Sequence, residues 1–161
     1  MPDFFKERTV RWADGCVILI DQTKLPNKMT YVRCMDARDI TDAIRNMVVR
    51  GAPAIGAAAA MGIALTACHS KSRNRKSLLS ELTTAANMLK STRPTGVNLF
   101  WGIERVLEKA KRIDGSPDDI RDGIIAEAIE ICDEDVSFNK EIGLHGADLL
   151  EDGETVLTHC K

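Results

Sequence analysis

The sequence predicts an α+β protein in which a small antiparallel β-meander precedes an α-helical bundle, followed by one strand in the order that opens a parallel α/β domain. Three observations carry this prediction. Short β-branched and aromatic runs fill the chain up to Cys34, and from Asp39 the apolar residues recur with helical spacing. A β-branched run returns after Asp152. We therefore place an N-terminal domain at residues 1–151 and the opening strand of a second domain at residues 152–161.

Three strands are expected near the N-terminus. They span Thr9–Trp12, Cys16–Ile20 and Met29–Cys34, each short and rich in β-branched or aromatic side chains. Asp14 and Gly15 separate the first two strands, which predicts a tight hairpin. The three strands therefore form an antiparallel meander.

Two helices should follow the sheet. The first has an apolar stripe that runs directly toward Arg50, so this helix is expected to aim that arginine. The stripe consists of Ile40, Ile44, Met47 and Val48. The uncharged stretch from Gly51 to Cys68 approaches membrane-spanning length, but alanine, glycine and threonine dominate it. A helix this weakly hydrophobic fits the centre of a helical bundle better than a lipid bilayer.

The start of this central helix has the features of a phosphate cradle. Pro53 fits the first turn of a helix, which makes Ala52 the expected N-cap. Alanine is a poor cap and no acidic residue follows in the first turn, so several backbone N–H groups lack a partner. Gly51 lets the backbone approach a ligand closely, and Arg50 offers a guanidinium suited to phosphate. The alternative that residue chemistry leaves open is a turn into a buried helix beside a solvated arginine.

Further helical stretches are expected, with apolar faces over residues 78–89, 99–110, 120–132 and 142–150. Arg93 stands before Pro94, which holds it out of helical geometry at the start of the second of these stretches. It is either a second phosphate-binding arginine or part of an ordinary turn. We interpret the basic segment at residues 70–76 as a solvated loop rather than as a nucleic-acid site.

The last segment, Glu154–Cys160, is rich in β-branched residues and follows a helix, which is the order that opens a parallel α/β sheet. One strand cannot satisfy its own backbone groups. With Lys161 next in the sequence, the strand is expected to be frayed, paired with another element or exposed as an edge.

The composition is that of a globular protein without a dominant charge. The 161 residues carry a formal net charge of -2, which gives no reason to expect a nucleic acid or a membrane as partner. Five cysteines are an odd number at irregular spacing, and the sequence shows no signal peptide, so we expect reduced thiols in a cytoplasmic protein. No cluster of metal ligands is visible in the sequence, and we expect neither a metal nor another cofactor.

Five motifs stand out together. They are Asp21-Gln22-Thr23 with Leu25-Pro26, the stretch Arg50–Gly56, the stretch Arg93–Leu99, the stretch Ile142–Ala147, and Leu157–Cys160. In this order they closely resemble methylthioribose-1-phosphate isomerase of methionine salvage. The resemblance extends over nearly the whole chain but only over the front part of a family member. It implies a sheet-and-bundle domain followed by a Rossmann-like domain, with full-length members forming homo-oligomers.

The resemblance also implies site residues. Arg50, Gly51 and Ala52 match the family's substrate-binding triplet, and Arg93 matches its second substrate-binding arginine. Cys160 matches an active-site cysteine that assists the transition state. The family's catalytic aspartate and its later Gln and Asn-Lys contacts have no counterpart in this sequence. We therefore expect half of an active site, which recognises a sugar phosphate but does not turn it over alone.

The reaction implied by the resemblance is an aldose-to-ketose isomerisation of 5-methylthioribose 1-phosphate. One alternative is a regulatory subunit of the translation initiation factor that exchanges guanine nucleotide on initiation factor 2, because those proteins share the architecture. Another is ribose-1,5-bisphosphate isomerase, which would accept a phosphate where the thioribose enzyme needs an apolar pocket. The joint presence of Arg50–Ala52, Arg93 and Cys160 favours an enzyme over a scaffold.

Overall fold

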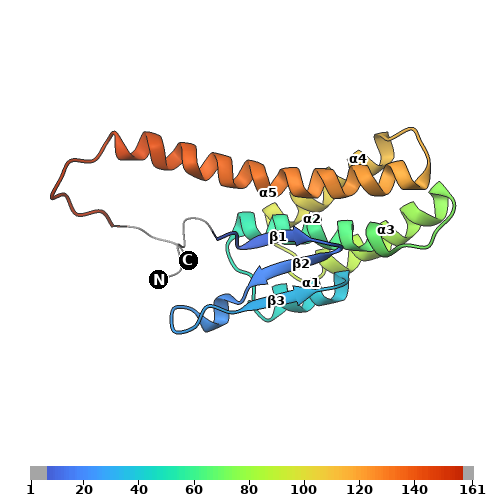
Figure 1. Cartoon of the computed structure of the whole chain (residues 1–161), viewed down its shortest axis with the longest axis horizontal. Helices are drawn as coiled ribbons and strands as arrows, with labels where there is room; N and C mark the ends of the chain where they lie inside the picture. Colours follow the sequence, from blue (N-terminus) through green and yellow to red (C-terminus); the bar gives the residue numbers. More distant parts are fainter. Residues whose placement is uncertain (1–6, 158–161) are drawn as a thin grey trace.

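The computed structural model describes residues 7–157 as a three-stranded sheet packed against a bundle of five α-helices (Figure 1). The strands are β1 (Val10–Ala13), β2 (Cys16–Ile20) and β3 (Tyr31–Cys34), and a 3-10 helix, η1 (Gln22–Lys24), follows β2. The helices are α1 (Ala37–Arg45), α2 (Ala52–His69), α3 (Arg75–Lys90), α4 (Val97–Arg112) and α5 (Pro117–Ala147). The predicted α+β class, with a β-meander before a helical bundle, is confirmed.

The sheet is an antiparallel meander in the order β1-β2-β3. Asp14 and Gly15 join β1 to β2, and both have a positive φ, 47° and 74°. A two-residue type I′ turn requires positive φ at both positions, so this turn fits the twist of the hairpin. Along β2, Val17 and Leu19 are fully buried against the helices, whereas Ile18 between them is partly exposed. This alternation fixes the register of the strands.

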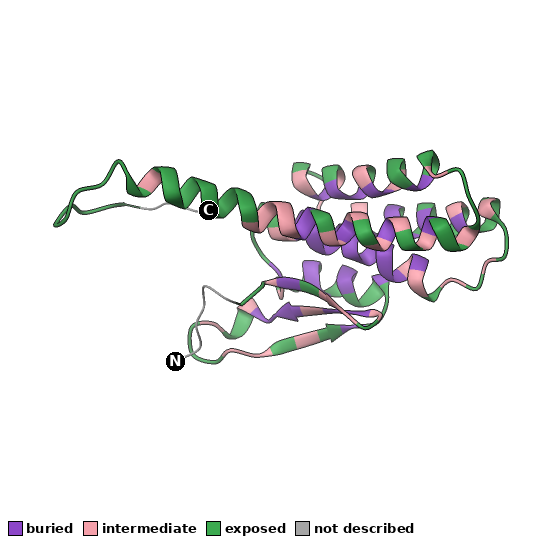
Figure 2. Ribbon diagram, turned by 45° about the horizontal axis from the view of Figure 1, so that its top comes forward, coloured by how far each residue is buried: buried purple, intermediate pink, exposed green. Residues whose placement is uncertain are grey.

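α2 is the central helix, and it contacts each of the other four helices. Its residues are buried almost without interruption from Ile55 to Ala67, which Figure 2 shows as a continuous purple core. By length and composition α2 could cross a membrane, but 67% of it is buried inside the protein, as in the core helix of a soluble protein. The predicted central position of this helix is confirmed.

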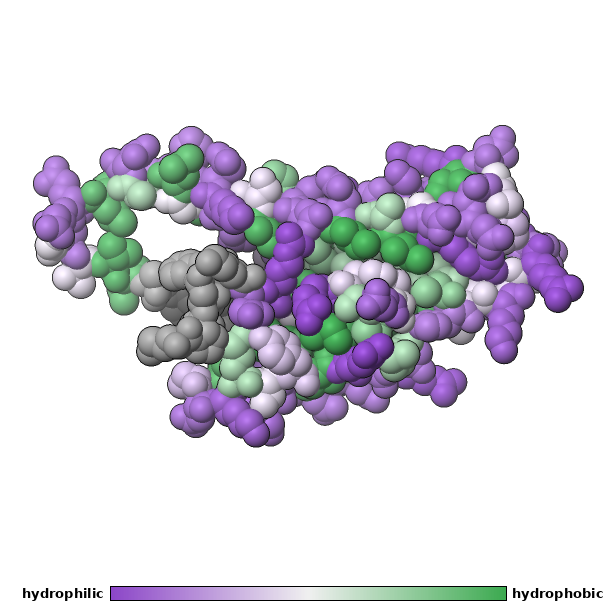
Figure 3. All heavy atoms as spheres, in the orientation of Figure 1, coloured by the Kyte–Doolittle hydropathy of each residue, from purple (hydrophilic) through white to green (hydrophobic). Residues whose placement is uncertain are grey.

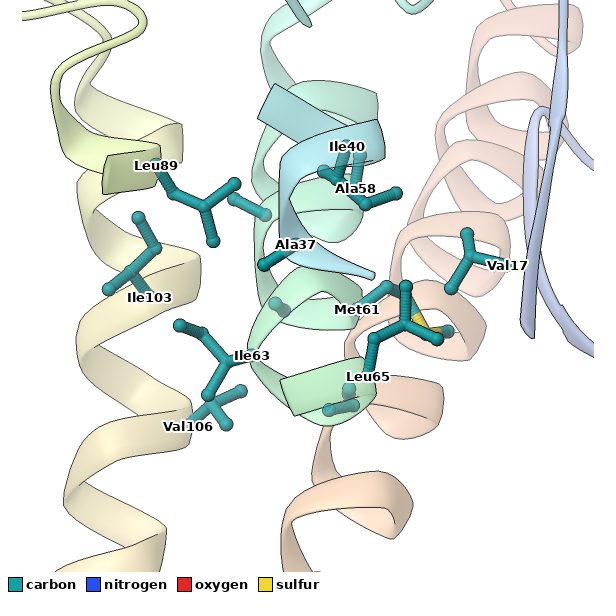
Figure 4. Packing of buried hydrophobic residues seen from close by; sticks show 14 of the residues in the cluster. Val17, Ala37, Ile40, Ala58, Met61, Ile63, Leu65, Leu89, Ile103 and Val106 are labelled. Atoms are coloured by element: carbon teal, nitrogen blue, oxygen red, sulfur yellow. The ribbon is translucent and has the colours of Figure 1, made fainter. Parts of the chain in front are cut away.

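Large side chains of α2 fill the space between the helices and the sheet. Figure 4 shows Ile63 of α2 beside Ile103 and Val106 of α4, and Met61 of α2 on the side of Val17 from β2. All of these residues are less than 2% exposed. The small alanines between them let neighbouring helices approach the α2 backbone closely.

α1 does not run into Arg50 as the sequence suggested, because it ends at Arg45. Met47 has a left-handed backbone with φ 59°, and the Val48 N–H donates to the Ala43 carbonyl over 2.9 Å. This is the pattern of a Schellman motif, in which the left-handed position is usually glycine. The resulting turn redirects the chain, so that Arg50 arrives at the start of α2.

The basic segment between α2 and α3 is only partly a solvated loop. Arg75, at the start of α3, donates from Nη2 to the carbonyl of Lys111 over 2.7 Å and to that of Ala110 over 3.4 Å. These carbonyls belong to the last turn of α4, where backbone acceptors have no partner within the helix. Arg75 therefore joins α3 to α4, whereas Lys71 and Arg73 are exposed.

α5 is one continuous helix of 31 residues, where the sequence suggested two separate stretches. Gly143 and Gly146 do not interrupt it, because the backbone ladder continues through both residues. Residues 137–145 are all exposed, and Figure 1 shows this end of α5 extending beyond the bundle. Apolar side chains gather there and on the segment that follows (Figure 3). They are Phe138, Ile142, Leu144, Leu149 and Leu150.

The predicted final strand is not formed over residues 154–157, which are exposed and without regular secondary structure. A strand needs a neighbour for its backbone groups, and the sheet of the described chain contains only β1, β2 and β3. The rest of the predicted strand, including Cys160, lies outside the described residues. A second domain beginning at residue 152 therefore stays a prediction.

Candidate phosphate-binding site

A cavity of about 510 Å³ opens where the N-terminal ends of α2 and α4 meet. Arg50, Gly51, Ala52 and Arg93, four of the five predicted site residues, all line it. The remaining lining residues are Gln22, Met47, Ile55, Gly96, Val97, Asn98 and Leu99. The fifth predicted residue, Cys160, lies outside the described part of the chain. The fold thus brings together two segments that are far apart in the sequence.

The first wall of the cavity is the start of α2. The N-cap is Gly51 rather than Ala52 as predicted, because the helix already begins at Ala52. Gly51 has φ 91° and ψ 130°, a backbone conformation that other residues rarely adopt. No side chain caps this helix end, and its first turn has no acidic residue. Its first N–H groups and the positive end of the helix dipole therefore face the cavity without a protein anion.

The second wall is the start of α4, which has the same character. Gly96 is the N-cap, no side chain caps the helix, and no acidic residue occupies the first turn. The other three α-helices differ, since side chains of Asp36, Asn74 and Ser116 cap α1, α3 and α5. The two uncapped helices are therefore the two that meet at this cavity, where an outside anion could accept hydrogen bonds from both.

Two guanidinium groups flank these helix ends. Arg50 is exposed and Arg93 is half-buried, and both contribute to the lining. Within residues 7–157 neither arginine pairs with a carboxylate. Unpaired arginines beside unpartnered backbone N–H groups make a site suited to a phosphate dianion, because both kinds of donor favour a negative ligand.

The remaining lining is mostly apolar. Met47, Ile55, Val97 and Leu99 contribute aliphatic surface, and none of the eleven lining residues carries a carboxylate or an imidazole. A second, apolar groove of about 490 Å³ adjoins the cavity and shares Val97 and Asn98 with it. The described part of the cavity can therefore bind an anion and an apolar group, but it contains no general acid or base.

An ion network fixes α4 against α5 below the cavity. Arg105 of α4 donates from Nε to Glu127 over 2.6 Å and from Nη2 to Glu134 over 2.8 Å. The Nζ of Lys109 lies 3.2 Å from the second oxygen of Glu127. Hydrogen bonds from Arg105 lower the pKa of Glu134. Burial raises the pKa of Glu127, but hydrogen bonds from Arg105 and Lys109 outweigh it and the pKa is lowered overall.

None of the cysteines of the described region lines the cavity. Cys16, Cys34 and Cys132 are buried, Cys68 is half-buried, and all four are free thiols. Burial raises the pKa of both Cys34 and Cys132 to about 12, so these thiols stay protonated at neutral pH. The predicted catalytic role of Cys160 concerns a residue outside the described region and stays a prediction.

Seven lining residues were not among the predicted site residues, and two of these, Gln22 and Met47, have a defined structural role. Gln22 donates from Nε2 to the Arg50 carbonyl over 3.1 Å, and Met47 occupies the left-handed position after α1. Gln22 belongs to the motif Asp21-Gln22-Thr23, so the sequence marked it as notable, but the motif did not indicate its contact with Arg50. Met47 appeared only as a member of the helical stripe, because a left-handed methionine leaves no trace in sequence pattern.

The comparison with known protein families agrees with this geometry. The model of the initiation factor 2 subunit family matches residues 48–161, a range that includes both walls of the cavity. The chain belongs to the initiation factor 2 subunit family. Among curated members, methylthioribose-1-phosphate isomerase of Trichlorobacter lovleyi is 50% identical over 154 residues, covering 95% of this chain and 44% of that protein. The corresponding protein of Geobacter metallireducens is 49% identical over the same shares.

Solved structures of the family have the same fold. The crystal structure of 5-methylthioribose 1-phosphate isomerase from Pyrococcus horikoshii matches with a TM-score of 0.89 and 38% identity, over 95% of this chain and 44% of that one. A structure titled translation initiation factor eIF-2B, subunit delta, from A. fulgidus matches with a TM-score of 0.84 and 45% identity, over 91% and 42%. The chain thus spans less than half the length of these family members.

Proposed function

We propose that this chain forms the phosphate-binding part of the active site of a methylthioribose-1-phosphate isomerase, which converts 5-methylthioribose 1-phosphate to the corresponding ribulose 1-phosphate. The observation that carries the proposal is the convergence on one cavity of two uncapped helix N-termini and two arginines, Arg50 and Arg93, that form no ion pair with the described carboxylates. The names of the relatives support the choice of substrate. Arg50, Gly51, Ala52 and Arg93 would hold the phosphate dianion.

The chemistry of the reaction requires groups that the described cavity does not contain. The phosphate on the anomeric oxygen prevents simple ring opening to a free aldehyde, so an acid must assist opening before hydrogen moves between C1 and C2. None of the described lining residues is a carboxylate or an imidazole. We assign this acid-base role to residues beyond the described region, and we assign assistance of the transition state to Cys160.

The apolar lining supports the thioribose substrate over a bisphosphate. Met47, Ile55, Val97 and Leu99 suit a methylthio group, whereas a second phosphate at the far end of the sugar would need further cationic donors. A regulatory role in translation initiation would not require this combination of anion donors and apolar wall. We further propose that the protein acts in the cytoplasm, in methionine salvage, as part of a homo-oligomeric enzyme with no nucleic acid or membrane partner.

Calorimetric titration tests the site. Inorganic phosphate and 5-methylthioribose 1-phosphate should both bind the purified chain, the thioribose phosphate more tightly. Because charge-assisted hydrogen bonds are strong, Arg50→Met and Arg93→Met should each weaken binding by about 10-fold or more. Arg73→Met is the matched control: Arg73 is an exposed arginine after the opposite end of α2 and should leave binding unchanged.

Three outcomes would contradict the proposal. Absence of binding by the wild-type chain, or equal binding by the Arg50, Arg93 and Arg73 variants, would remove the phosphate site. Turnover of the thioribose phosphate by the chain alone, above a Cys160→Ala control, would show that the described cavity is not half of a site, because an acid and base would then have to be present.

A further inference from the structure

Gln22 links the sheet to the segment that carries Arg50. Its backbone N–H donates to the Val48 carbonyl over 2.9 Å, and its side-chain Nε2 donates to the Arg50 carbonyl over 3.1 Å. A carbonyl oxygen can only accept, which fixes the amide with its nitrogen toward Arg50. Two hydrogen bonds from one residue therefore hold the chain just before α2, at the edge of the cavity that Gln22 itself lines.

The Arg50 carbonyl lies outside the hydrogen-bond ladder of α2. The Ile55 N–H donates to the Gly51 carbonyl over 2.9 Å, so the helix holds the peptide after Gly51 and not the one before it. In a planar trans peptide the carbonyl and the following N–H point in opposite directions. The direction of the Arg50 carbonyl therefore sets the direction of the Gly51 N–H.

Gly51 gives this peptide unusual freedom. Its φ is 91°, and a Cβ built on it would meet no atom within 4 Å, so no neighbour packs against that side of the residue. Glycine populates both signs of φ about equally, and the peptide plane before it can turn over at little cost. One orientation presents an N–H to the cavity, and the other presents a carbonyl oxygen, which repels an anion. A specific partner for the Arg50 carbonyl is needed to select the first orientation.

We propose that Gln22 is a positioning residue of the phosphate site, whose side-chain amide holds the Arg50 carbonyl and thereby directs the Gly51 N–H into the cavity. The inference rests on the proposed function, because it places an anion in that cavity. Gln22 acts through the Arg50–Gly51 peptide and leaves both guanidinium groups unchanged. Its removal should therefore lower affinity for phosphate without abolishing binding.

The test compares Gln22→Met and Gln22→Glu with the wild-type chain. Methionine keeps the length of the side chain and glutamate keeps its shape, but neither donates to a carbonyl at neutral pH. In the free, ¹⁵N-labelled chain, the Gly51 amide resonance should shift and its hydrogen exchange should change in both variants. In a titration with inorganic phosphate, loss of one hydrogen bond in Gln22→Met should weaken binding by about 3- to 10-fold, and Gln22→Glu should weaken it further because it adds a negative charge to the cavity lining.

Thr23→Ala is the matched control. Thr23 belongs to the same turn and donates from Oγ1 to Asp21 over 2.5 Å, but no hydrogen bond joins it to Arg50. It should lower the melting temperature without changing the Gly51 resonance or the phosphate affinity. Unchanged phosphate binding and an unchanged Gly51 resonance in both Gln22 variants would overturn the positioning role alone. Absence of phosphate binding by the wild-type chain would overturn the proposed function, and the positioning role with it.

Discussion

Gly56 of α2 and Gly102 of α4 meet backbone to backbone. A Cβ on Gly56 would lie 2.6 Å from the Asn98 carbonyl oxygen, and a Cβ on Gly102 would press against the carbonyl oxygen of Gly56. Real Cβ atoms do not approach backbone oxygens this closely. The two helices therefore cross with their backbones in close contact, about one turn after each begins. This crossing brings the uncapped ends of α2 and α4 to the same cavity.

Alanine at either crossing position should destabilise the chain and impair the site. Gly56→Ala or Gly102→Ala must push α4 away from α2, and such overpacking costs about 1–3 kcal/mol of unfolding free energy. Phosphate affinity should fall as well, because the two helix ends separate. Urea denaturation and phosphate titration measure the two effects.

Gly143→Ala provides the comparison for these variants. Gly143 also lies in a helix, but a Cβ there meets nothing within 4 Å. Since alanine has the higher helix propensity, this change should stabilise the chain by about 0.5–1 kcal/mol. If all three alanine variants were equally stable, the close crossing would be wrong.

The local parts of the fold could be predicted from the sequence, because their causes are local. Asp14 and Gly15 suit the hairpin turn whatever surrounds them, and the composition of α2 requires burial. The single helix α5 was missed because Gly143 and Gly146 lower helix propensity, although an established helix can propagate through both.

The site could be predicted only in its parts. The residues around Arg50 and those around Arg93 each fit either an anion site or an ordinary turn. Residue chemistry alone does not distinguish these two interpretations. Their meeting depends on the crossing of Gly56 with Gly102, a contact between distant segments that periodicity does not encode. The family resemblance, rather than local pattern, placed both arginines in one site before the structure did.

Met47→Gly should make the chain more stable and lower its affinity for the proposed substrate. A methionine at φ 59° carries left-handed strain of about 1–2 kcal/mol, which exceeds the extra chain entropy that glycine loses on folding. We expect a net gain of about 0.5–1 kcal/mol. The side chain lines the cavity, so affinity for 5-methylthioribose 1-phosphate should fall while affinity for inorganic phosphate stays constant.

Asp14→Gly separates the two effects of the Met47 variant. Asp14 also has a positive φ, 47°, but it lies in the hairpin turn and not in the cavity. Relief of its strain should raise stability without changing affinity for either ligand. A thermal melt of each variant and a titration with both ligands check this. Equal losses of thioribose phosphate affinity in the two variants would show that Met47 does not contact the substrate.

Arg105→Met should lower stability at neutral pH and make the chain less sensitive to acid. The pKa values of Glu134 and Glu127 are lowered in the folded chain, so their ionised forms stabilise it. This contribution to the free energy of unfolding is complete above the ordinary carboxyl pKa of about 4.3 and is lost as pH falls through the lowered folded pKa. The three side chains are 26%, 14% and 31% exposed for Arg105, Glu127 and Glu134, so solvent screens the network in part. We expect a loss of about 1 kcal/mol at pH 7.

Urea denaturation from pH 3 to pH 7 measures this effect. The wild-type and Arg105→Met curves should begin to converge below the ordinary carboxyl pKa of about 4.3 and should meet only below the lowered pKa of the folded wild-type chain, where the carboxylates are protonated in both proteins. Arg112→Met is the control, since Arg112 pairs with Glu108 on the same helix and its side chain is 79% exposed. That variant should follow the wild-type curve throughout. If the difference in free energy of unfolding between the Arg105 variant and the wild type stayed constant down to pH 3, the lost stability would come from packing and not from the ion network.

The exposed C-terminal half of α5, from residue 137 onward, should unfold locally far more easily than the buried N-terminal half. Ile120, Ile124 and Ile131 anchor the first four turns in the core, whereas residues 137–145 are all exposed. An isolated helix of this length is marginal in water, because helix nucleation is costly and most helical stability comes from packing. Hydrogen exchange should therefore show strong protection at residues 124–132 and weak protection at residues 139–147. Equal protection along the whole helix would mean that another surface covers this half in solution, and Phe138→Ser with Ile142→Ser would then lower protection only in that half.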